Sequence, residues 1–156
     1  MKICIRAAGL IKSGPERELI DDYLARSRKL GRGLGLPEIT ESAIDIRNCK
    51  SRTEATNAIL STVNPAERLV VLDERGKSIS SRQMAQQIAD WRDDGVNRLV
   101  LAIGGADGFE PSAVPPQTDR WQLGRLTWPH RLVRVMLAEQ IYRSLSILAK
   151  TPYHRD

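Results

Sequence analysis

RLVLAIGGADG, at residues 98–108, joins an apolar run of strand-like length to a glycine-rich turn. Two other segments repeat this arrangement, because LDERGK at residues 72–77 and LTWPHRLVRV at residues 126–135 also follow or end an apolar run. The carboxyl ends of parallel strands meet at one edge of a sheet, and ligands of open α/β sheets bind just beyond that edge. The three loops therefore predict a pocket for a small cofactor with nucleotide-like parts.

Strand-like and helix-like segments alternate along the rest of the chain. Helix starts are marked by Pro15 in a first turn, by the capping box Ser51-x-x-Glu54, and by Ser80 or Ser81. Short continuous apolar runs are typical of parallel strands covered on both faces, so the pattern predicts an α/β fold, a single domain over residues 1–156 with a parallel sheet flanked by helices. The expected strands are 2–8, 38–46, 68–73, 98–103 and a weaker one at 121–126. The expected helices run from 15 to about 30, from the cap at 51 to 64–65, from 80 or 81 to 95, and from 129 to 150. Residues 31–37 are expected to form a flexible connector between the first helix and the second strand.

The last expected helix is apolar around most of its circumference. Such a helix is either buried in the middle of the domain or forms half of a dimer contact. Because the chain is short, we expect the dimer. The apolar positions are Val133, Leu137, Ile141, Leu145 and Leu148 on one side, and Leu132, Val135 and Tyr142 toward the other.

Composition argues against a disulfide-rich, zinc-binding, secreted or membrane-spanning protein. The chain has 156 residues and a formal net charge of +5, and its basic residues concentrate after Arg120. That distribution fits either a phosphate-rich partner or an ordinary solvated basic face. Cys4 and Cys49 lie far apart, without the spacing of a zinc site or a disulfide scaffold, so no metal is expected. Without a signal peptide or a membrane-length apolar run, we expect a cytoplasmic protein with no membrane partner.

The glycine loop and the charged loop each allow two interpretations. Gly104-Gly105-x-x-Gly108 resembles a phosphate-cradling loop, but its spacing is not that of a dinucleotide fingerprint, and a simple tight turn explains it equally well. The LDERGK segment is either a solvated turn or one wall of the pocket. In the second case Leu72 would contact a flat apolar group such as adenine, with Glu74, Arg75 and Lys77 at the pocket mouth.

Both histidines fall in segments already singled out. His130 follows Pro129 at a helix start, where a capping role is the ordinary explanation. His154 lies in a polar tail between Tyr153 and Arg155, which together offer two proton carriers and an anion-binding group. Such a tail can also be without a role. Glu139 is expected to pair with an arginine, most simply Arg143 one helical turn later.

Taken in order, the segments LDERGK with the following serine pair, IGGADG, LTWPH, RVMLAEQIYR and the terminal PYHR resemble the RlmH family. These are small SPOUT-type methyltransferases that act on ribosomal RNA of the large subunit. The resemblance runs through the chain and is strongest from Leu69 to the end. It implies a carboxyl-terminal trefoil knot over about residues 69–156 and S-adenosylmethionine as the methyl donor, released as S-adenosylhomocysteine. The donor-binding positions that it implies are Leu72, Gly104, Leu123, Gly124, Arg125, Leu126, Thr127 and Trp128.

The resemblance also implies the reaction, methylation of N3 of a pseudouridine in 23S ribosomal RNA of the assembled ribosome by a homodimer. Because that nitrogen carries a proton, the reaction needs deprotonation, and His154 or Tyr153 could take the proton or order a water. Arg155 and Arg143 would hold a phosphate or the developing anion. His130 and Arg131 are also expected to bind the RNA substrate. The alternatives are a non-catalytic ribosome-binding protein and a knotted methyltransferase acting on tRNA.

Overall fold

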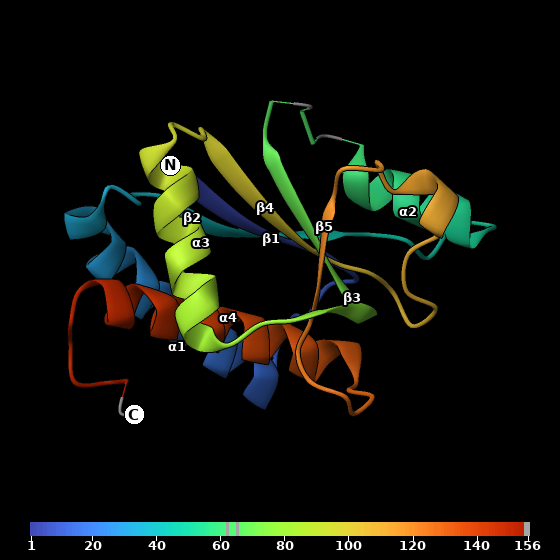
Figure 1. The fold of residues 1–156 in the computed structure, drawn as a ribbon. Coiled ribbons are helices and arrows are strands. Elements are labelled where there is room, and N and C mark those ends of the chain that lie inside the picture. The colour runs from blue at the N-terminus through green and yellow to red at the C-terminus, as the bar shows by residue number, and fades with distance from the viewer. Residues whose placement is uncertain (62, 65, 155–156) are drawn as a thin grey trace.

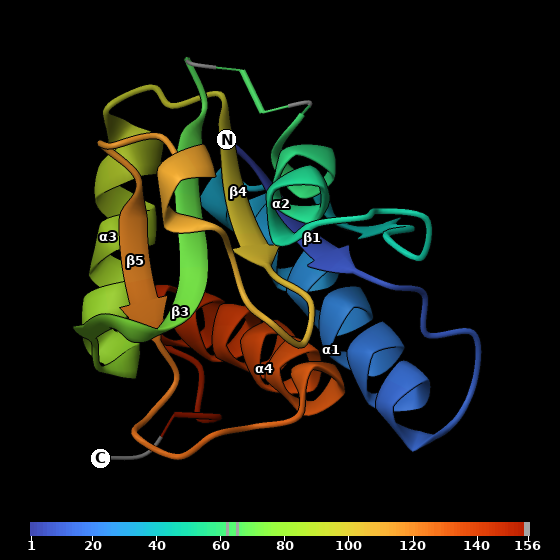
Figure 2. The same cartoon turned by 90° about the vertical axis from the view of Figure 1, so that its right-hand side faces the viewer.

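A parallel sheet forms the centre of the computed structural model, which describes residues 1–61, 63–64 and 66–154. Within these residues the sheet has five strands in the order β2-β1-β4-β3-β5, and every neighbouring pair is parallel. The arrowheads of β4 and β5, for example, both point downward in Figure 2. This confirms the expected parallel α/β sheet. The strands are β1 (Lys2–Ala8), β2 (Ile39–Ile44), β3 (Arg68–Ser78), β4 (Arg98–Ile103) and β5 (Asp119–Gln122).

Helices cover both faces of this sheet (Figure 1). Pro15 begins the first helix, and the side chains of Ser51 and Ser80 accept the N–H groups of Glu54 and Gln83 to cap the next two. Helices α1, α3 and α4 lie on one face, and α2 lies on the other. Their bounds are α1 (Pro15–Gly31), α2 (Arg52–Leu60), α3 (Ser81–Asp93) and α4 (His130–Leu148), with short 3-10 turns η1 (Arg32–Leu34) and η2 (Pro111–Ala113).

Alternation along β4 divides the core between the two faces. Leu99 and Leu101 pack toward α1, α3 and α4, whereas Val100 and Ala102 pack toward α2. All four side chains are almost completely buried. Successive residues of a strand point to opposite faces, so a strand covered on both sides needs this unbroken apolar run.

Helix α4 lies between α1 and α3 on the sheet, which accounts for most of its apolar circumference. Leu137, Ile141 and Leu145 are fully buried within the chain, and Leu132 remains 41% exposed. Of the two explanations for this helix, burial in the middle of the fold is therefore the one seen. The helix alone gives no reason to expect a dimer.

Some expected boundaries were wrong. Residues 31–37 are not a flexible connector, because η1 continues α1 and Leu36 is fully buried. Gly31 has a right-handed helical backbone, and glycine is required there because a Cβ would collide with the carbonyl oxygen of Leu36. The residue with a left-handed backbone conformation is Gly35. Helix α2 ends at Leu60 rather than near Asn64, and Pro65 lies outside the described residues. The strand expected at 68–73 continues to 78, and the one expected at 121–126 lies at 119–122. The knot expected over residues 69–156 stays a prediction.

Candidate functional site

A cavity of about 300 Å³ opens at the carboxyl ends of the adjacent strands β4, β3 and β5. This is the edge at which the three loops were expected to meet. Each strand contributes the residues that follow it, and α4 closes one side with its first turn. The wall is formed by Arg52, Leu72, Asp73, Glu74, Arg75, Ile103, Gly104, Gly105, Ala106, Asp107, Gly108, Phe109, Pro111, Trp121, Leu123, Gly124, Leu126, Thr127, Trp128, His130 and Val133.

The loop after β4 is both a tight turn and part of the cavity wall. Gly108 donates its N–H to the carbonyl of Gly105 at 3.0 Å and has a φ of +69°. A Cβ on Gly104 would lie 3.0 Å from the carbonyl carbon of Gly108, so a larger residue has no room there. The two interpretations of the glycine motif are therefore compatible, since the turn brings backbone groups to the ligand space.

The wall from β3 exists because the strand is irregular. Leu72 and Lys77 both align with Trp121 of β5, so the residues between them bulge out of the ladder. Gly76 permits this, because a Cβ there would lie 2.7 Å from the backbone of Trp121. The bulge places Asp73 and its neighbours Glu74 and Arg75 in the wall, as the pocket interpretation of LDERGK required, whereas Lys77 is not among the residues lining it.

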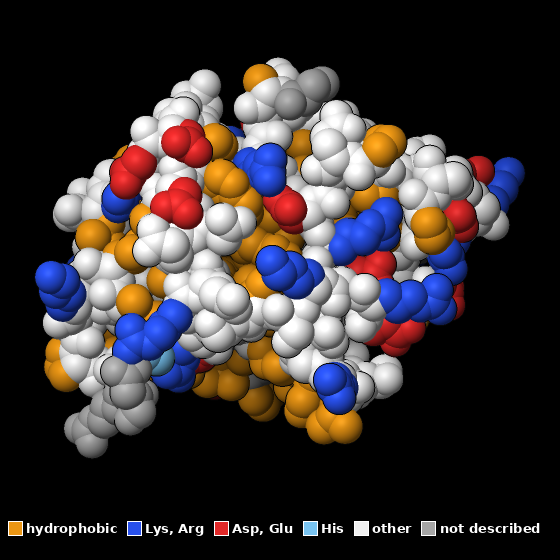
Figure 3. Space-filling view, viewed as in Figure 1, with side chains coloured by type: hydrophobic (Ala, Val, Ile, Leu, Met, Phe, Trp, Pro, Cys, Tyr) orange, Lys and Arg blue, Asp and Glu red, His pale blue; other side chains and the backbone are white. Residues whose placement is uncertain are grey.

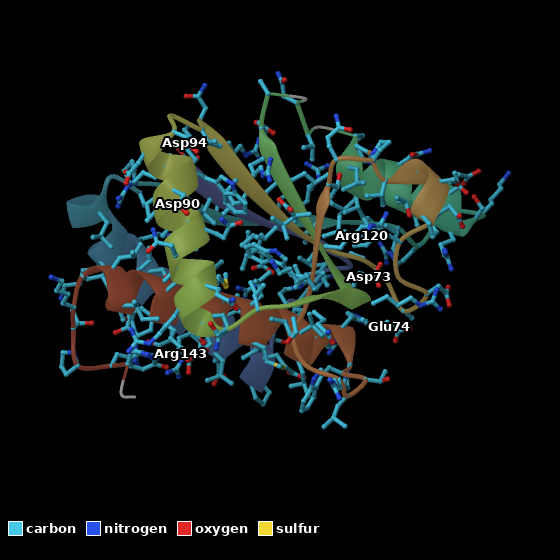
Figure 4. The ribbon with its side chains drawn as sticks, viewed as in Figure 1. Asp73, Glu74, Asp90, Asp94, Arg120 and Arg143 are labelled. Carbon is cyan, nitrogen blue, oxygen red and sulfur yellow. The ribbon has the colours of Figure 1, made fainter. Side chains whose placement is uncertain are left out.

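Asp73 is held at the rim by two hydrogen bonds. Its carboxylate accepts from the Arg75 backbone N–H at 2.9 Å and pairs with Arg120 of β5 at 3.2 Å. Figure 4 shows Asp73 and Arg120 close together, with Glu74 at the outer end of the same bulge. The ion pair therefore joins the two strands whose loops form the cavity.

The segment after β5 contributes most of the remaining wall. Leu123, Gly124, Leu126, Thr127 and Trp128 line the cavity; Arg125 of the same segment does not. The side chains of Leu126 and Trp128 are 69% and 39% exposed, so they form an apolar rim. Gly124 has a φ of +105°, a conformation that a side chain would strain.

His130 is the first residue of α4 and lines the cavity beside Val133. Burial lowers the pKa of its imidazole, and the positive charges of Arg134 and Arg131 lower it further. His130 was expected to contact RNA together with Arg131. Of the two, only His130 lies in the cavity wall, and Arg131 is exposed.

A buried arginine fixes the start of α4 against the sheet. Arg134, 1% exposed, donates to the carbonyl oxygens of Ala8 and Gly9 at 2.7 and 2.8 Å and to the Glu41 carboxylate at 3.0 Å. Arg17 of α1 binds the other oxygen of Glu41 at 2.6 Å. The first turns of α4, including His130, are thus tied to the carboxyl end of β1.

The expected catalytic tail follows the last turn of α4 and folds back against the middle of that helix. Tyr153 donates its hydroxyl hydrogen to Glu139 at 3.0 Å, and Arg143 binds the same carboxylate at 2.6 Å. His154 is half-buried beside them, and Arg155 lies outside the described residues. Burial and hydrogen bonds with Tyr23 and Glu139 raise the pKa of Tyr153, which favours its protonated form.

The tail and the cavity are not brought together within one chain. Thirteen residues separate His130 from Arg143 along α4, a distance of about 20 Å at the rise of an α-helix. Figure 4 shows Arg143 well apart from Asp73, Glu74 and Arg120. The residues expected to bind the donor therefore lie around the first turn of α4, and those expected to catalyse lie against the middle and second half of the helix.

Sequence reasoning missed several wall residues. Arg52 begins α2 and reaches the cavity from the other face of the sheet, where it pairs with Glu110 at 3.2 Å. Phe109 and Pro111 follow the glycine loop. No local signal marks Arg52, because its place depends on how α2 packs against a loop about 50 residues later.

Metal and membrane features are not seen in the residues that the structure describes. Within 1–61, 63–64 and 66–154, no three His, Cys, Asp or Glu side chains gather as a metal-binding group. Among the described helices, none combines the length and apolar character that crossing a bilayer needs.

Comparison with known proteins identifies the family. Ribosomal RNA large subunit methyltransferase H of Maricaulis maris is 51% identical over the whole of both chains, and that of Cereibacter sphaeroides (strain ATCC 17029) is 47% identical over 99% of each. A methyltransferase-assigned protein of Legionella pneumophila, solved with its cofactor SAM, has a similar structure. The match covers 95% of this chain and 66% of the Legionella chain, with 13% sequence identity and a TM-score of 0.47. This similarity is too distant to bear on the site. The model described as "Predicted SPOUT methyltransferase" matches residues 1–154. The chain therefore belongs to this SPOUT methyltransferase family.

Proposed function

We propose that the chain is an S-adenosylmethionine-dependent methyltransferase that acts on N3 of a pseudouridine in 23S ribosomal RNA. The observation that carries the proposal is the cavity, because seven of the eight positions expected to bind the donor line it. The names of the relatives supply the substrate class, ribosomal RNA of the large subunit. The seven positions are Leu72, Gly104, Leu123, Gly124, Leu126, Thr127 and Trp128.

The residues of the cavity fit such a donor. A volume of about 300 Å³ is at the lower end of the range for small-molecule sites. Leu72, Leu123 and Trp128 offer apolar surface to a purine ring, and the backbone at Gly104 can approach polar edges because no side chain intervenes. When bound, S-adenosylmethionine supplies an activated methyl carbon.

The RNA would be held mainly through its phosphates. The chain carries 24 Lys and Arg residues against 19 Asp and Glu. Phosphate contacts of this kind give affinity and position, while the shape of the assembled ribosome would select the target base. A substrate in assembled ribosomes also implies that the protein works in the cytoplasm.

A homodimer would unite the cavity of one chain with the tail of another. Tyr153 and His154 follow α4, and Tyr153 binds the middle of that helix, away from the chain's own cavity, but a partner chain could present both residues there. Exposed apolar side chains offer a contact surface: Leu126 and Trp128 at the cavity rim, and Leu132 in the first turn of α4. Figure 3 shows apolar side chains gathered along the lower edge of the molecule, beneath α4. On this arrangement Tyr153, His154, Arg155 and Arg143 would act on RNA bound at the partner's cavity.

Methyl transfer to defined RNAs tests the proposal. Ribosomes, isolated large subunits and bulk tRNA from cells lacking this gene would each be incubated with the protein and labelled S-adenosylmethionine, and the RNA analysed by mass spectrometry. We expect one methyl group on a pseudouridine of 23S RNA in ribosomes. Activity on tRNA alone would overturn the choice of substrate.

Calorimetry with S-adenosylmethionine separates an enzyme from a non-catalytic ribosome-binding protein. We expect saturable binding by the parent chain and none by Gly104→Trp, because that side chain would fill the space against Gly108. Gly33→Ala is the matched control, since Gly33 has open space around it. Absence of binding by the parent would favour the ribosome-binding protein.

A further inference from the structure

The cavity wall holds one of the two histidines of the chain. His130 lies at the start of α4, whereas His154 lies beyond the other end of that helix. Of the carboxylates in the wall, Asp73 binds Arg120 and the Arg75 backbone, Glu74 lies 3.8 Å from Arg75, and Asp107 is carried by the glycine loop. Imidazole is also the side chain best suited to accept a proton near neutral pH.

The position of His130 is fixed by its own helix. Arg134, one turn later, is anchored by Ala8, Gly9 and Glu41 at hydrogen-bond distances of 2.7–3.0 Å. A catalytic group gains from being carried on a rigid element, because the orientation of its ring is then set before substrate arrives.

Burial and the neighbouring arginines favour the neutral form of the His130 ring. Burial together with Arg134 and Arg131 lowers the pKa of the imidazole, so the unprotonated ring predominates at neutral pH. A neutral ring can accept a proton, and it does not repel the positive charge of a sulfonium donor in the same cavity. Across the cavity, the charged groups of the other elements are Asp73, Glu74 and Arg75 of β3, Asp107 of the glycine loop and Arg52 of α2.

We propose that His130 is the proton acceptor for N3 of the target pseudouridine, an inference that rests on the function proposed above. The N3–H bond breaks and its proton passes to the imidazole. The electron pair left on N3 forms the bond to the methyl carbon, and the carbon–sulfur bond breaks with its electrons remaining on sulfur. The imidazolium then releases the proton to water.

Tyr153 and Arg143 are less suited to this step. The hydroxyl of Tyr153 already donates to Glu139, and the raised pKa of Tyr153 keeps that hydroxyl protonated. Arg143 carries a permanent charge and binds Glu139. These groups can hold and orient RNA, while His130 removes the proton.

Single-turnover rates across pH test the assignment. On ribosomes, His130→Gln should slow methyl transfer by about 10²–10⁴-fold at neutral pH. Its rate should recover as the pH rises toward the ionisation of the imide, because solvent then removes the proton. His154→Gln is the matched control, and any loss that it causes should not recover. A His130→Gln rate within threefold of the parent, or a deficit that pH does not change, overturns the proposal.

Donor binding gives a second measurement that does not depend on turnover. Calorimetry should show that S-adenosylmethionine binds the parent and His154→Gln more weakly as the pH falls through the pKa of His130, and that His130→Gln lacks this dependence. The two imidazole signals in proton NMR report that pKa directly. If His130→Gln does not fold, His130→Asn and the titration of the parent serve instead, and a His130 pKa above the ordinary value overturns the proposal. An active parent with an equally active variant refutes only this inference, whereas an inactive parent refutes the proposed function.

Discussion

Arg134 and Glu41 form an ion pair with 3.0 Å between Nη1 and Oε1, in which the arginine side chain is 1% exposed and the carboxylate 10%. The two residues lie 93 positions apart, on α4 and β2. Arg17 supplies a second positive charge to the same carboxylate at 2.6 Å. One buried acid therefore joins the three elements α1, β2 and α4.

Glu41→Gln should destabilise the fold strongly. The substitution leaves two positive charges facing a neutral amide, and breaking a buried pair in this way costs about 3–5 kcal/mol. Urea unfolding measures the loss. Asp22→Asn is the control, because the Asp22–Arg26 pair is exposed and its loss should cost at most about 0.5 kcal/mol. Equal stabilities of the two variants would show that the Glu41 network contributes little.

Gly76→Ala should damage both stability and donor binding. Its Cβ would lie 2.7 Å from the backbone of Arg120 and Trp121, so β3 and β5 must separate, at a cost of about 1–3 kcal/mol. Calorimetry with S-adenosylmethionine and urea unfolding check the two effects. Gly33→Ala, at an open position, should bind the donor normally. Normal donor binding by Gly76→Ala would mean that the bulge does not shape the cavity.

Tyr153→Phe should loosen the tail without disturbing the cavity. It removes the hydrogen bond to Glu139, worth about 1 kcal/mol, and keeps the ring that packs 4.6 Å from Tyr142. In the parent, ultraviolet titration should show one tyrosine that stays protonated above the ordinary tyrosine pKa, because the pKa of Tyr153 is raised. The same abnormal tyrosine in Tyr153→Phe would assign the shift to another residue.

His154→Ala should lower turnover and leave donor affinity nearly unchanged, because the tail packs against the middle of α4, away from the donor cavity at its first turn. Methyl transfer to ribosomes and calorimetry with S-adenosylmethionine measure the two quantities. Turnover equal to that of the parent would remove His154 from the mechanism.

Acidification should weaken the fold through His130. The folded-state pKa of this residue lies below its ordinary value, so between the two the unfolded chain binds a proton that the folded chain does not. Stability is therefore lost as the pH falls through about 6.5 toward the lowered pKa. Urea unfolding of the parent and of His130→Gln, each at both ends of this pH range, measures the change in the free energy of unfolding. The variant should lose less stability on acidification than the parent. An equal loss in both would assign the effect to the carboxylates.

Local chemistry made much of the fold predictable. The serine before α3 and the proline that opens α1 act on their own helices, and the apolar run of β4 follows from burial on both faces. The place of the cavity could also be predicted, since parallel strands must end at the same edge.

Contacts between distant segments could not be predicted. Arg134 belongs to the basic segment after Arg120, which was interpreted as a surface. Its side chain is nevertheless buried, because it pairs with Glu41, which lies on β2 and is far away in the sequence. The need for glycine at position 76 comes from the approach of Trp121, and the burial of α4 comes from α1 and α3 on either side. No pattern within a single segment reports such approaches.

The separation between the cavity at His130 and the tail at Tyr153 has a consequence for paired variants if the chain works as a dimer. A chain with a damaged cavity and a chain with a damaged tail would each be inactive alone. Mixed in one solution, they would form hybrid pairs in which one intact cavity faces one intact tail, so half of the sites in each hybrid would regain activity through complementation.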